Sequence, residues 1–179
     1  MADKDVKDPE QYLTFVLDSE IYAVEIGKVR EVLDMIRITH VPNMPAFMRG
    51  VINLRGGVVP VIDLREKFHL TKVADTVTTC IIILELFLDG VETLVGAVAD
   101  SVREVMRLDD LKLEAPPRMG NRLKTEFIRG MINRDNEFII VLDIMKVFSM
   151  EELEALSDRN VLAGSPTSET VSTTKEQLC

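Results

Sequence analysis

Two segments, residues 47–68 and 127–148, repeat one phrase, and this repeat constrains the fold more than any other feature. The first reads FMRGVINLRGGVVPVIDLREKF and the second FIRGMINRDNEFIIVLDIMKVF, aligned without a gap. A shorter echo, VREV, begins at Val29 and again at Val102. The chain is therefore a tandem of two similar units, and two units are too few for a solenoid. We expect units of about 11–70 and 77–150, packed as paired sheets or barrels. The identical pairs are Phe47/Phe127, Arg49/Arg129, Gly50/Gly130, Ile52/Ile132, Asn53/Asn133, Val61/Val141, Asp63/Asp143 and Phe68/Phe148.

Each unit begins with an expected β-hairpin. The first is YLTFVLDSEIYAVEI, in which apolar and β-branched residues flank the polar turn Asp18-Ser19-Glu20. The second is CIIILELFLDGVETLVGAVAD, with Asp89-Gly90 as the strongest short hairpin signal in the chain. A connector with two prolines follows each VREV segment and blocks long regular structure there.

The repeated phrase predicts two further hairpins, with turns at 55–57 and around Asp135-Asn136. A positive φ is expected at Gly56 or Gly57. Pro60 lacks an amide proton, so VVPVI should be an edge strand or carry a local break. Asp63 has the spacing to cap a short helical turn. Ser149-Met-Glu-Glu152 has the same spacing and predicts a longer helix that ends near Leu156.

Short strands with glycine and proline turns, and no helical crossovers, predict an all-β fold of two small barrels. Units of this size have marginal cores, so they should share apolar surface. The composition is that of a soluble globular protein, with 46% hydrophobic and 28% charged residues. Residues 1–10 are expected to form a flexible leader. Residues 157–179 turn to serine, threonine and charge, and are expected to be a disordered tail.

The charge and the cysteines exclude several classes of protein. A formal net charge of −9 disfavours nucleic-acid binding. No transmembrane or signal segment is recognisable. The two cysteines, Cys80 and Cys179, do not suggest a disulfide framework, which favours a reducing, cytoplasmic setting.

No pattern of catalytic, cofactor-binding or metal-ligating residues is present. The only histidines are His40 and His69, and no CxxC, HExxH or GxSxG motif occurs. The glycines at 50 and 56–57 lie between strands and not at the start of a helix, so a phosphate loop is not indicated. The sequence therefore predicts that the chain is not an enzyme.

Two features leave both a structural and a binding interpretation open. Arg55 follows an apolar strand and precedes two glycines. It is either a solvated turn residue or a residue that contacts a binding partner. Val29 and Val32 flank Arg30-Glu31, either as core residues or as the lining of a groove for a partner helix.

The motifs resemble the CheW family of chemotaxis coupling proteins. The resemblance is carried by Val41-Pro42, Pro45 and Phe47, then GVINLRG at 50–56 and PVIDLR at 60–65, after YAVEIGKVREV at 22–32. It covers roughly residues 11–156. It implies two interleaved, five-stranded SH3-like barrels with a shared apolar interface, and no catalytic activity. It also implies an adaptor, cytoplasmic at membrane-associated chemoreceptor arrays, that links methyl-accepting chemotaxis receptors to the regulatory domain of the histidine kinase CheA.

Carried over by position, the resemblance implies a receptor-binding surface that includes Val29, Glu31, Gly50 and Arg55. Arg118 and Met119 fall where the second barrel of the family makes a ring contact with the kinase. This sequence departs from better-known members there, with a methionine in place of a bulkier aromatic and an arginine in place of an acid. Phe138, on the strand after Asp135-Asn136, is a further candidate for the kinase contact.

Other functions remain open from the sequence. The chain could be a coupling module for a non-motility chemosensory pathway, or a module cut from a larger protein such as CheA. A small-ligand-binding β-barrel is the alternative from another class, and it requires a polar-lined pocket with convergent ionisable groups.

Overall fold

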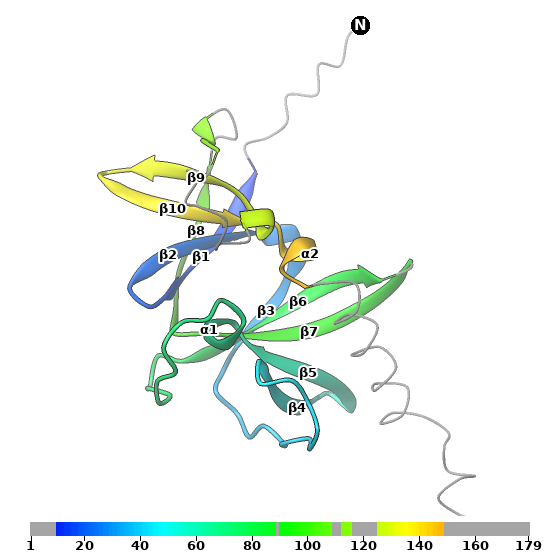
Figure 1. Cartoon of the computed structure of the whole chain (residues 1–179). Helices are drawn as coiled ribbons and strands as arrows, with labels where there is room; N and C mark the ends of the chain where they lie inside the picture. The colour runs from blue at the N-terminus through cyan, green and yellow to red at the C-terminus, as the bar shows by residue number, and fades with distance from the viewer. Residues whose placement is uncertain (1–9, 89, 109–111, 116–124, 149–179) are drawn as a thin grey trace, which may run out of the picture.

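A computed structural model describes residues 10–88, 90–108, 112–115 and 125–148 of the 179-residue chain. Ten strands form two five-stranded sheets that pack together, with only short helical segments between them (Figure 1). The prediction of an all-β fold built from two packed five-stranded units is confirmed.

The first sheet, sheet A, has the strand order β8-β1-β2-β10-β9. It combines the hairpin of the first unit with three strands of the second unit. These strands are β1 (Gln11–Leu17), β2 (Glu20–Glu25), β8 (Ser101–Arg107), β9 (Ile128–Arg134) and β10 (Glu137–Leu142).

The second sheet, sheet B, has the order β3-β6-β7-β5-β4 and the reciprocal composition. It combines the hairpin of the second unit with three strands of the first. These strands are β3 (Val29–Asp34), β4 (Met48–Leu54), β5 (Gly57–Asp63), β6 (Cys80–Leu88) and β7 (Val91–Ala99).

The two units therefore exchange their first hairpins. Each exchanged hairpin is joined to the other unit by one antiparallel pair, β1 with β8 or β6 with β3, and by one parallel joint, β2 with β10 or β7 with β5. The remaining described strand pairs are antiparallel. Val141 pairs with Ala23 in one joint, and the repeat-equivalent Val61 pairs with Gly96 in the other. The duplication seen in the sequence is thus also a symmetry of the sheets, but neither sheet belongs to one unit.

Two-residue turns close the hairpins, with positive φ at both central residues where both are described. The angles are 50° and 67° at Asp18 and Ser19, and 52° and 65° at Asp135 and Asn136. Such turns match the right-handed twist of antiparallel strands. In the turn after β4 the positive angles fall on Arg55 and Gly56, at 50° and 86°. The prediction holds for Gly56, whereas Gly57 is the first residue of β5.

An aspartate caps a short helix near the end of each copy of the phrase. Asp63 accepts from the amides of Arg65, at 2.9 Å, and Glu66, at 3.4 Å, at the start of α1 (Leu64–Lys67), as predicted. Asp143 accepts from the Met145 amide at the start of α2 (Ile144–Val147). The second cap was missed, although the identity of Asp143 with Asp63 was a sufficient signal. The described residues also include the 3₁₀ turns η1 (Ile26–Lys28) and η4 (Thr125–Phe127). The helix expected after Ser149 lies outside the described residues.

Pro60 was expected in an edge strand or at a local break. Strand β5 is interior in sheet B, so the edge alternative is wrong, whereas the ladder with β7 does stop at the proline, and the missing amide proton costs no ladder bond. Val51, opposite Pro60, directs both its amide and its carbonyl to Thr39. The ladder of β5 with β7 begins only at Val61, directly after the proline. The backbone nitrogen of Pro60 therefore faces a stretch where no strand pairs.

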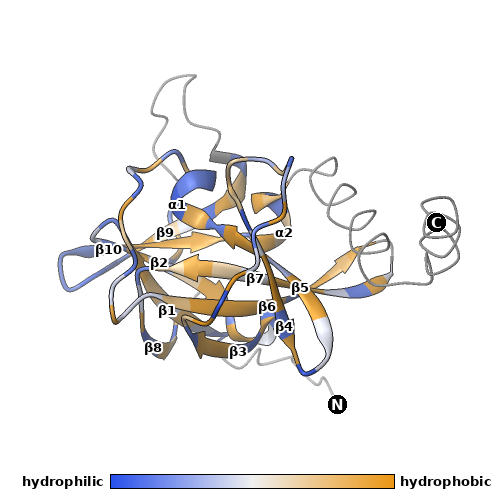
Figure 2. Cartoon of the chain, turned by 90° about the horizontal axis from the view of Figure 1, so that it is seen from below, coloured by the Kyte–Doolittle hydropathy of each residue, from blue (hydrophilic) through white to orange (hydrophobic). Residues whose placement is uncertain are grey.

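Apolar residues gather in three clusters, one inside each sheet and a larger one between the sheets. Strand β6 is buried on both faces: Ile81 and Ile83 point into sheet B, whereas Ile82 and Leu84 point into the shared cluster. Its nearly continuous apolar sequence follows from this double burial. Figure 2 shows that strands of both sheets are largely hydrophobic. A series of stacked rings crosses the shared cluster, from Phe15 through Tyr22 and Phe68 to Phe127, with centroids 5.9, 5.9 and 4.8 Å apart.

Candidate functional site

Arg55 and Glu31, two residues expected on the receptor-binding surface, form a paired salt bridge. The two guanidinium nitrogens of Arg55 donate to the two carboxylate oxygens of Glu31 at 2.8 and 2.9 Å. Glu31 lies on β3 and Arg55 in the turn between β4 and β5, at opposite ends of the strand order of sheet B. The pair therefore closes the seam where this sheet curls back on itself. The side chain of Arg55 is 72% exposed and that of Glu31 is 23% exposed, so the arginine faces solvent.

Gly50 lies under the same seam, where its lack of a side chain lets the backbone of Thr39 come close. Thr39 and Val51 exchange two backbone hydrogen bonds, at 2.8 and 2.9 Å, which tie the chain after β3 to β4. A Cβ on Gly50 would lie 2.1 Å from the Thr39 carbonyl oxygen, and its φ is +144°. Gly50 is buried, so it shapes the seam from beneath.

Val29 is partly buried and packs against the shared cluster, opposite Leu84 on β6. A shift in register separates it from Glu31, so the two side chains are not successive members of one regular strand face. Exposed apolar side chains do lie on or beside the strands of the seam, with Val32 40%, Ile36 42% and Val58 41% exposed. The four expected receptor residues thus come from the strands around one seam, but only Arg55 is largely exposed.

The equivalent seam of sheet A has a different chemistry. By the repeat, Glu31 corresponds to Glu104 and Arg55 to Asp135, so two acids replace the salt-bridged pair. These acids line a hollow of about 170 Å³ with Arg103, Arg134 and other residues. Arg103 contacts Glu137 at 3.8 Å, and Arg134 contacts the sulfur of Met106 at 3.3 Å. The two seams therefore present different charged groups to a partner.

The kinase-facing positions are only partly described. Phe138 lies on β10 opposite Asn133, and it is 48% exposed, so it is available for a contact. Arg118 and Met119 lie outside the described residues. Of the three positions, the structure describes only Phe138.

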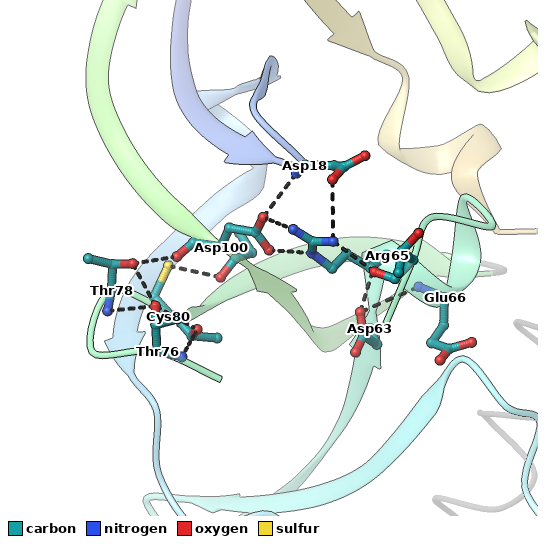
Figure 3. A network of polar contacts seen from close by, with 11 residues as sticks. Asp18, Asp63, Arg65, Glu66, Thr76, Thr78, Cys80 and Asp100 are labelled. Atoms are coloured by element: carbon teal, nitrogen blue, oxygen red, sulfur yellow. Dashed lines mark hydrogen bonds and ion pairs between the residues drawn. The ribbon is translucent and has the colours of Figure 1, made fainter. Parts of the chain in front are cut away.

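A further ionic cluster, missed from the sequence, lies where the chain passes from one sheet to the other. Arg65, on α1, donates to both oxygens of Asp100 at 2.7 and 2.5 Å, and to the Thr71 carbonyl at 2.8 Å (Figure 3). Asp100 stands between β7 of sheet B and β8 of sheet A, and it also accepts from the Asp18 amide at 2.9 Å. One guanidinium thus ties α1 to the point where the chain passes from one sheet to the other. The repeat gave no signal for it, because Met145 stands at the position equivalent to Arg65.

Hydrogen bonding favours the ionised forms of this pair. The hydrogen bond to Asp100 raises the pKa of Arg65 above its ordinary value, against the opposing effect of burial. Burial by itself would raise the pKa of Asp100, but the donors from Arg65 and from the Asp18 amide outweigh it and lower that pKa. The arrangement is typical of an ion pair that stabilises the fold, since both groups stay charged.

Within the described part of the chain, no three His, Cys, Asp or Glu side chains are grouped so that they could hold a metal ion. The same residues contain no helix that is long and apolar enough to cross a membrane. A second hollow, of about 110 Å³, lies between η1 and α2 and is lined by Glu25, Lys28, Arg129, Asp143 and apolar neighbours. Its charged groups are of mixed sign, and Arg129 is engaged by Glu25 at 2.7 Å.

The known proteins to which the chain is similar in sequence and structure, as reported below, belong to one family. Residues 11–152 match the model of the CheW-like domain. The chain is 35% identical over 144 residues to a chemotaxis protein CheW of Klebsiella aerogenes, covering 80% of this chain and 84% of that protein. It is 29% identical over 152 residues to that of Treponema pallidum, covering 83% and 87%. The crystal structure of a scaffolding protein CheW from Thermoanaerobacter tengcongensis superposes with a TM-score of 0.71 at 32% identity, covering 83% and 94%. The chain therefore belongs to the CheW family of non-catalytic scaffold proteins.

Proposed function

We propose that the chain couples the cytoplasmic tips of methyl-accepting chemotaxis receptors to the histidine kinase CheA, in cytoplasmic arrays beneath the membrane. Membership of the CheW family supports this proposal, together with the presence of two barrel-like sheets whose seams differ in chemistry. The observation that carries the receptor half is the exposed guanidinium of Arg55, held by Glu31 at the seam of sheet B.

The receptor would bind around this seam, with Arg55 as its charged contact and Val32 as an apolar one. Because Glu31 engages both guanidinium nitrogens, the arginine is held in one orientation before a partner arrives. Gly50 acts beneath the surface, by letting the segment at Thr39 approach β4. A receptor helix that lays an apolar face on the seam would fit this mixture of one charged group and exposed valines.

The kinase domain would dock on sheet A, where Phe138 offers an exposed aromatic ring. Arg118 and Met119 remain further candidates for this contact. Interfaces of this kind are expected to bury on the order of 1,000–1,600 Å² in total, and the array would add strength through many linked contacts.

The test is to reconstitute the chain with receptor fragments and CheA, and to measure kinase activity with and without the receptor. We expect kinase activity to depend on the receptor only when the chain is present. Kinase activity that is the same with and without the chain would contradict the proposal.

Two substitutions separate the two halves of the proposal. Arg55→Glu should abolish co-sedimentation with receptor-bearing membranes while CheA binding is retained, and Phe138→Asp should do the reverse. Arg103→Glu is the matched control for Arg55→Glu, because Arg103 is also exposed but lies at the other seam. If Arg55→Glu still sediments fully with receptor membranes, the assignment of this seam is wrong.

A further inference from the structure

Strand β8 of sheet A and the equivalent strand β3 of sheet B each carry a bulge, but the two bulges are held differently. In sheet B the register shifts just before Glu31, and Glu31 is then paired with Ile83 on β6. In sheet A the register of β1 with β8 passes over Thr14 and over Glu104, the residue equivalent to Glu31. Ordinary strand pairing is therefore replaced at this point of sheet A.

The repeat places Thr14 and Ile83 at equivalent positions. Thr14 pairs with Ala23 and Ile83 pairs with Gly96, and Ala23 and Gly96 are the equivalent residues of the two parallel joints. Both side chains are buried, Thr14 with 1% and Ile83 with 0% of its surface exposed. Sheet A thus has a hydroxyl where sheet B has an apolar side chain. A hydroxyl at such a site is costly unless it is hydrogen-bonded.

The hydroxyl of Thr14 finds both its partners on the backbone of Glu104. It donates to the Glu104 carbonyl oxygen at 2.8 Å and accepts from the Glu104 amide at 3.2 Å. The bulge of β8 is therefore fixed by a side chain. Bulges are a common means of re-aiming a side chain, and here the fixed residue carries an exposed carboxylate.

This carboxylate lacks the partner that its counterpart in sheet B has. Glu31 receives both guanidinium nitrogens of Arg55, whereas Asp135 stands at the position equivalent to Arg55 in the second unit. Glu104 and Asp135 line the hollow of about 170 Å³ at the seam of sheet A, and neither carboxylate is engaged by another described residue. The seam of sheet A has thus kept the acceptor of the salt bridge and lost its donor.

Two arginines line the same hollow, but they contact other groups. Arg103 lies 3.8 Å from Glu137, and Arg134 donates to the sulfur of Met106 at 3.3 Å. Of the described residues that line the hollow, three are acidic and two are basic. The hollow therefore favours a cation over an anion.

Exposed apolar side chains accompany the charges at both seams. Val105 follows Glu104 on β8 and Phe138 lies on β10, and each is about half exposed. By the repeat they correspond to Val32 and Val58 at the seam of sheet B, which are exposed to a similar extent. A charged group beside exposed apolar side chains is suited to a protein partner, which can cover the apolar surface and supply the missing charge.

We propose that the seam of sheet A binds a basic side chain, lysine or arginine, of the kinase domain, which pairs with Glu104 and Asp135. Apolar groups of the same domain cover the two exposed apolar side chains of this seam. Thr14 is the positioning residue of the contact, because it holds the backbone of Glu104. The cation of the partner completes the salt bridge that Arg55 completes within the chain at the other seam. This inference rests on the proposed function, in which the kinase docks on sheet A.

The test measures the affinity of the full chain for the isolated regulatory domain of CheA, at low and at high salt. Glu104→Gln removes the charge with little change of volume, and it should weaken this affinity about fivefold or more at low salt and less at high salt. Co-sedimentation with receptor membranes should be unchanged, since the other seam is intact. Glu66→Gln is the matched control, because Glu66 lies on α1 and does not line the hollow, and it should bind like the natural chain.

The positioning role of Thr14 is tested by Thr14→Val and Thr14→Ser. Valine keeps the shape without the hydroxyl and should weaken binding of the kinase domain, whereas serine keeps the hydroxyl and should restore most of the affinity. Adding Thr14→Val to Glu104→Gln should cost less than it does in the natural chain, because both changes act on one contact. A merely structural role would weaken co-sedimentation with the receptor to the same extent.

The outcomes separate this inference from the proposed function. If the natural chain binds the kinase domain and Glu104→Gln binds it equally well or better, the basic contact is wrong while the proposed function stands. If Thr14→Val weakens binding to receptor and kinase domain alike, or if Thr14→Ser does not restore binding, the positioning role is wrong. Absence of binding by the natural chain would overturn both the inference and the kinase half of the proposed function.

Discussion

Arg65 donates to both carboxylate oxygens of Asp100 from a side chain that is only 12% exposed, at the residue where the chain passes from sheet B to sheet A. Three elements meet there, because the Asp18 amide of the β1–β2 turn donates to the same carboxylate. The pair therefore joins the parts of the molecule that strand pairing alone leaves separate.

Asp100→Asn should destabilise the fold, because it leaves the guanidinium of Arg65 without its charged acceptor. Breaking a buried ion pair costs about 3–5 kcal/mol, and the 27% exposure of the Asp100 side chain reduces the expected loss to about 2 kcal/mol. Urea denaturation measures it. Asp75→Asn is the matched control, since Asp75 pairs with Arg49 at 2.7 Å but is 39% exposed, and its loss should be below about 1 kcal/mol. Equal losses would contradict a special role for Asp100.

The contribution of Asp100 should depend on pH in one direction. Its pKa is lower in the folded protein than in the unfolded chain, so the folded state binds fewer protons at acidic pH. The stabilisation is therefore fully present above the unfolded pKa, about 4, and is lost as the pH falls through the folded pKa. The difference in unfolding free energy between the natural chain and Asp100→Asn should be constant near neutral pH and shrink below about pH 4. A difference that grows on acidification would refute the direction of this shift.

Gly50→Ala should be among the most damaging small substitutions in the chain. The new Cβ would lie 2.1 Å from a backbone oxygen of Thr39, which cannot move without breaking the bonds between Thr39 and Val51. We expect a loss of about 3 kcal/mol or more, or failure to fold. Gly56→Ala meets no atom within 4 Å but keeps a φ of +86°, and should cost about 1 kcal/mol. Gly27→Ala meets neither obstacle and should be nearly neutral in thermal unfolding.

The two capping aspartates should differ in their contribution. Asp143→Ala removes one cap bond to Met145 and should cost about 1 kcal/mol. Asp63→Ala removes bonds to two amides and also a contact with Arg49 at 3.2 Å, so its cost should be larger, about 2 kcal/mol. Chemical denaturation of the two variants under the same conditions compares them. A larger loss for Asp143→Ala would show that the cap at α1 is not reinforced by Arg49.

The repeat predicted the hairpins and the similarity of the two units, because turn residues and capping aspartates act locally. The resemblance implied interleaved barrels, but the repeat did not show which strands are exchanged, because pairing of β2 with β10 depends on which apolar faces meet in three dimensions. Gly50 and Gly130 illustrate the same limit. Their identity was visible, but the reason for it, a backbone carbonyl or a leucine directly above each, required the fold.

The site was less predictable than the fold. Arg55 and Glu31 were named as neighbours on a surface, and the structure brings them together as a salt bridge. The ion pair of Arg65 and Asp100 could not be predicted from a sequence pattern, since the two residues are 35 positions apart and the second copy of the repeat has no equivalent pair. The prediction that the chain is not an enzyme is confirmed by its membership of a non-catalytic family.

Because the hairpins are exchanged, each sheet depends structurally on both halves of the chain. Each sheet is completed by strands from the other half, so a change of core volume in one half is felt in a sheet that the other half builds. The strands at the joints therefore pack against residues that the other half supplies. The turns at Arg55 and Asp135 are outside those joints, and they could change separately without disturbing either sheet. The two halves thus share their sheets, while each half keeps a turn, at Arg55 or at Asp135, whose surface can differ from that of the other.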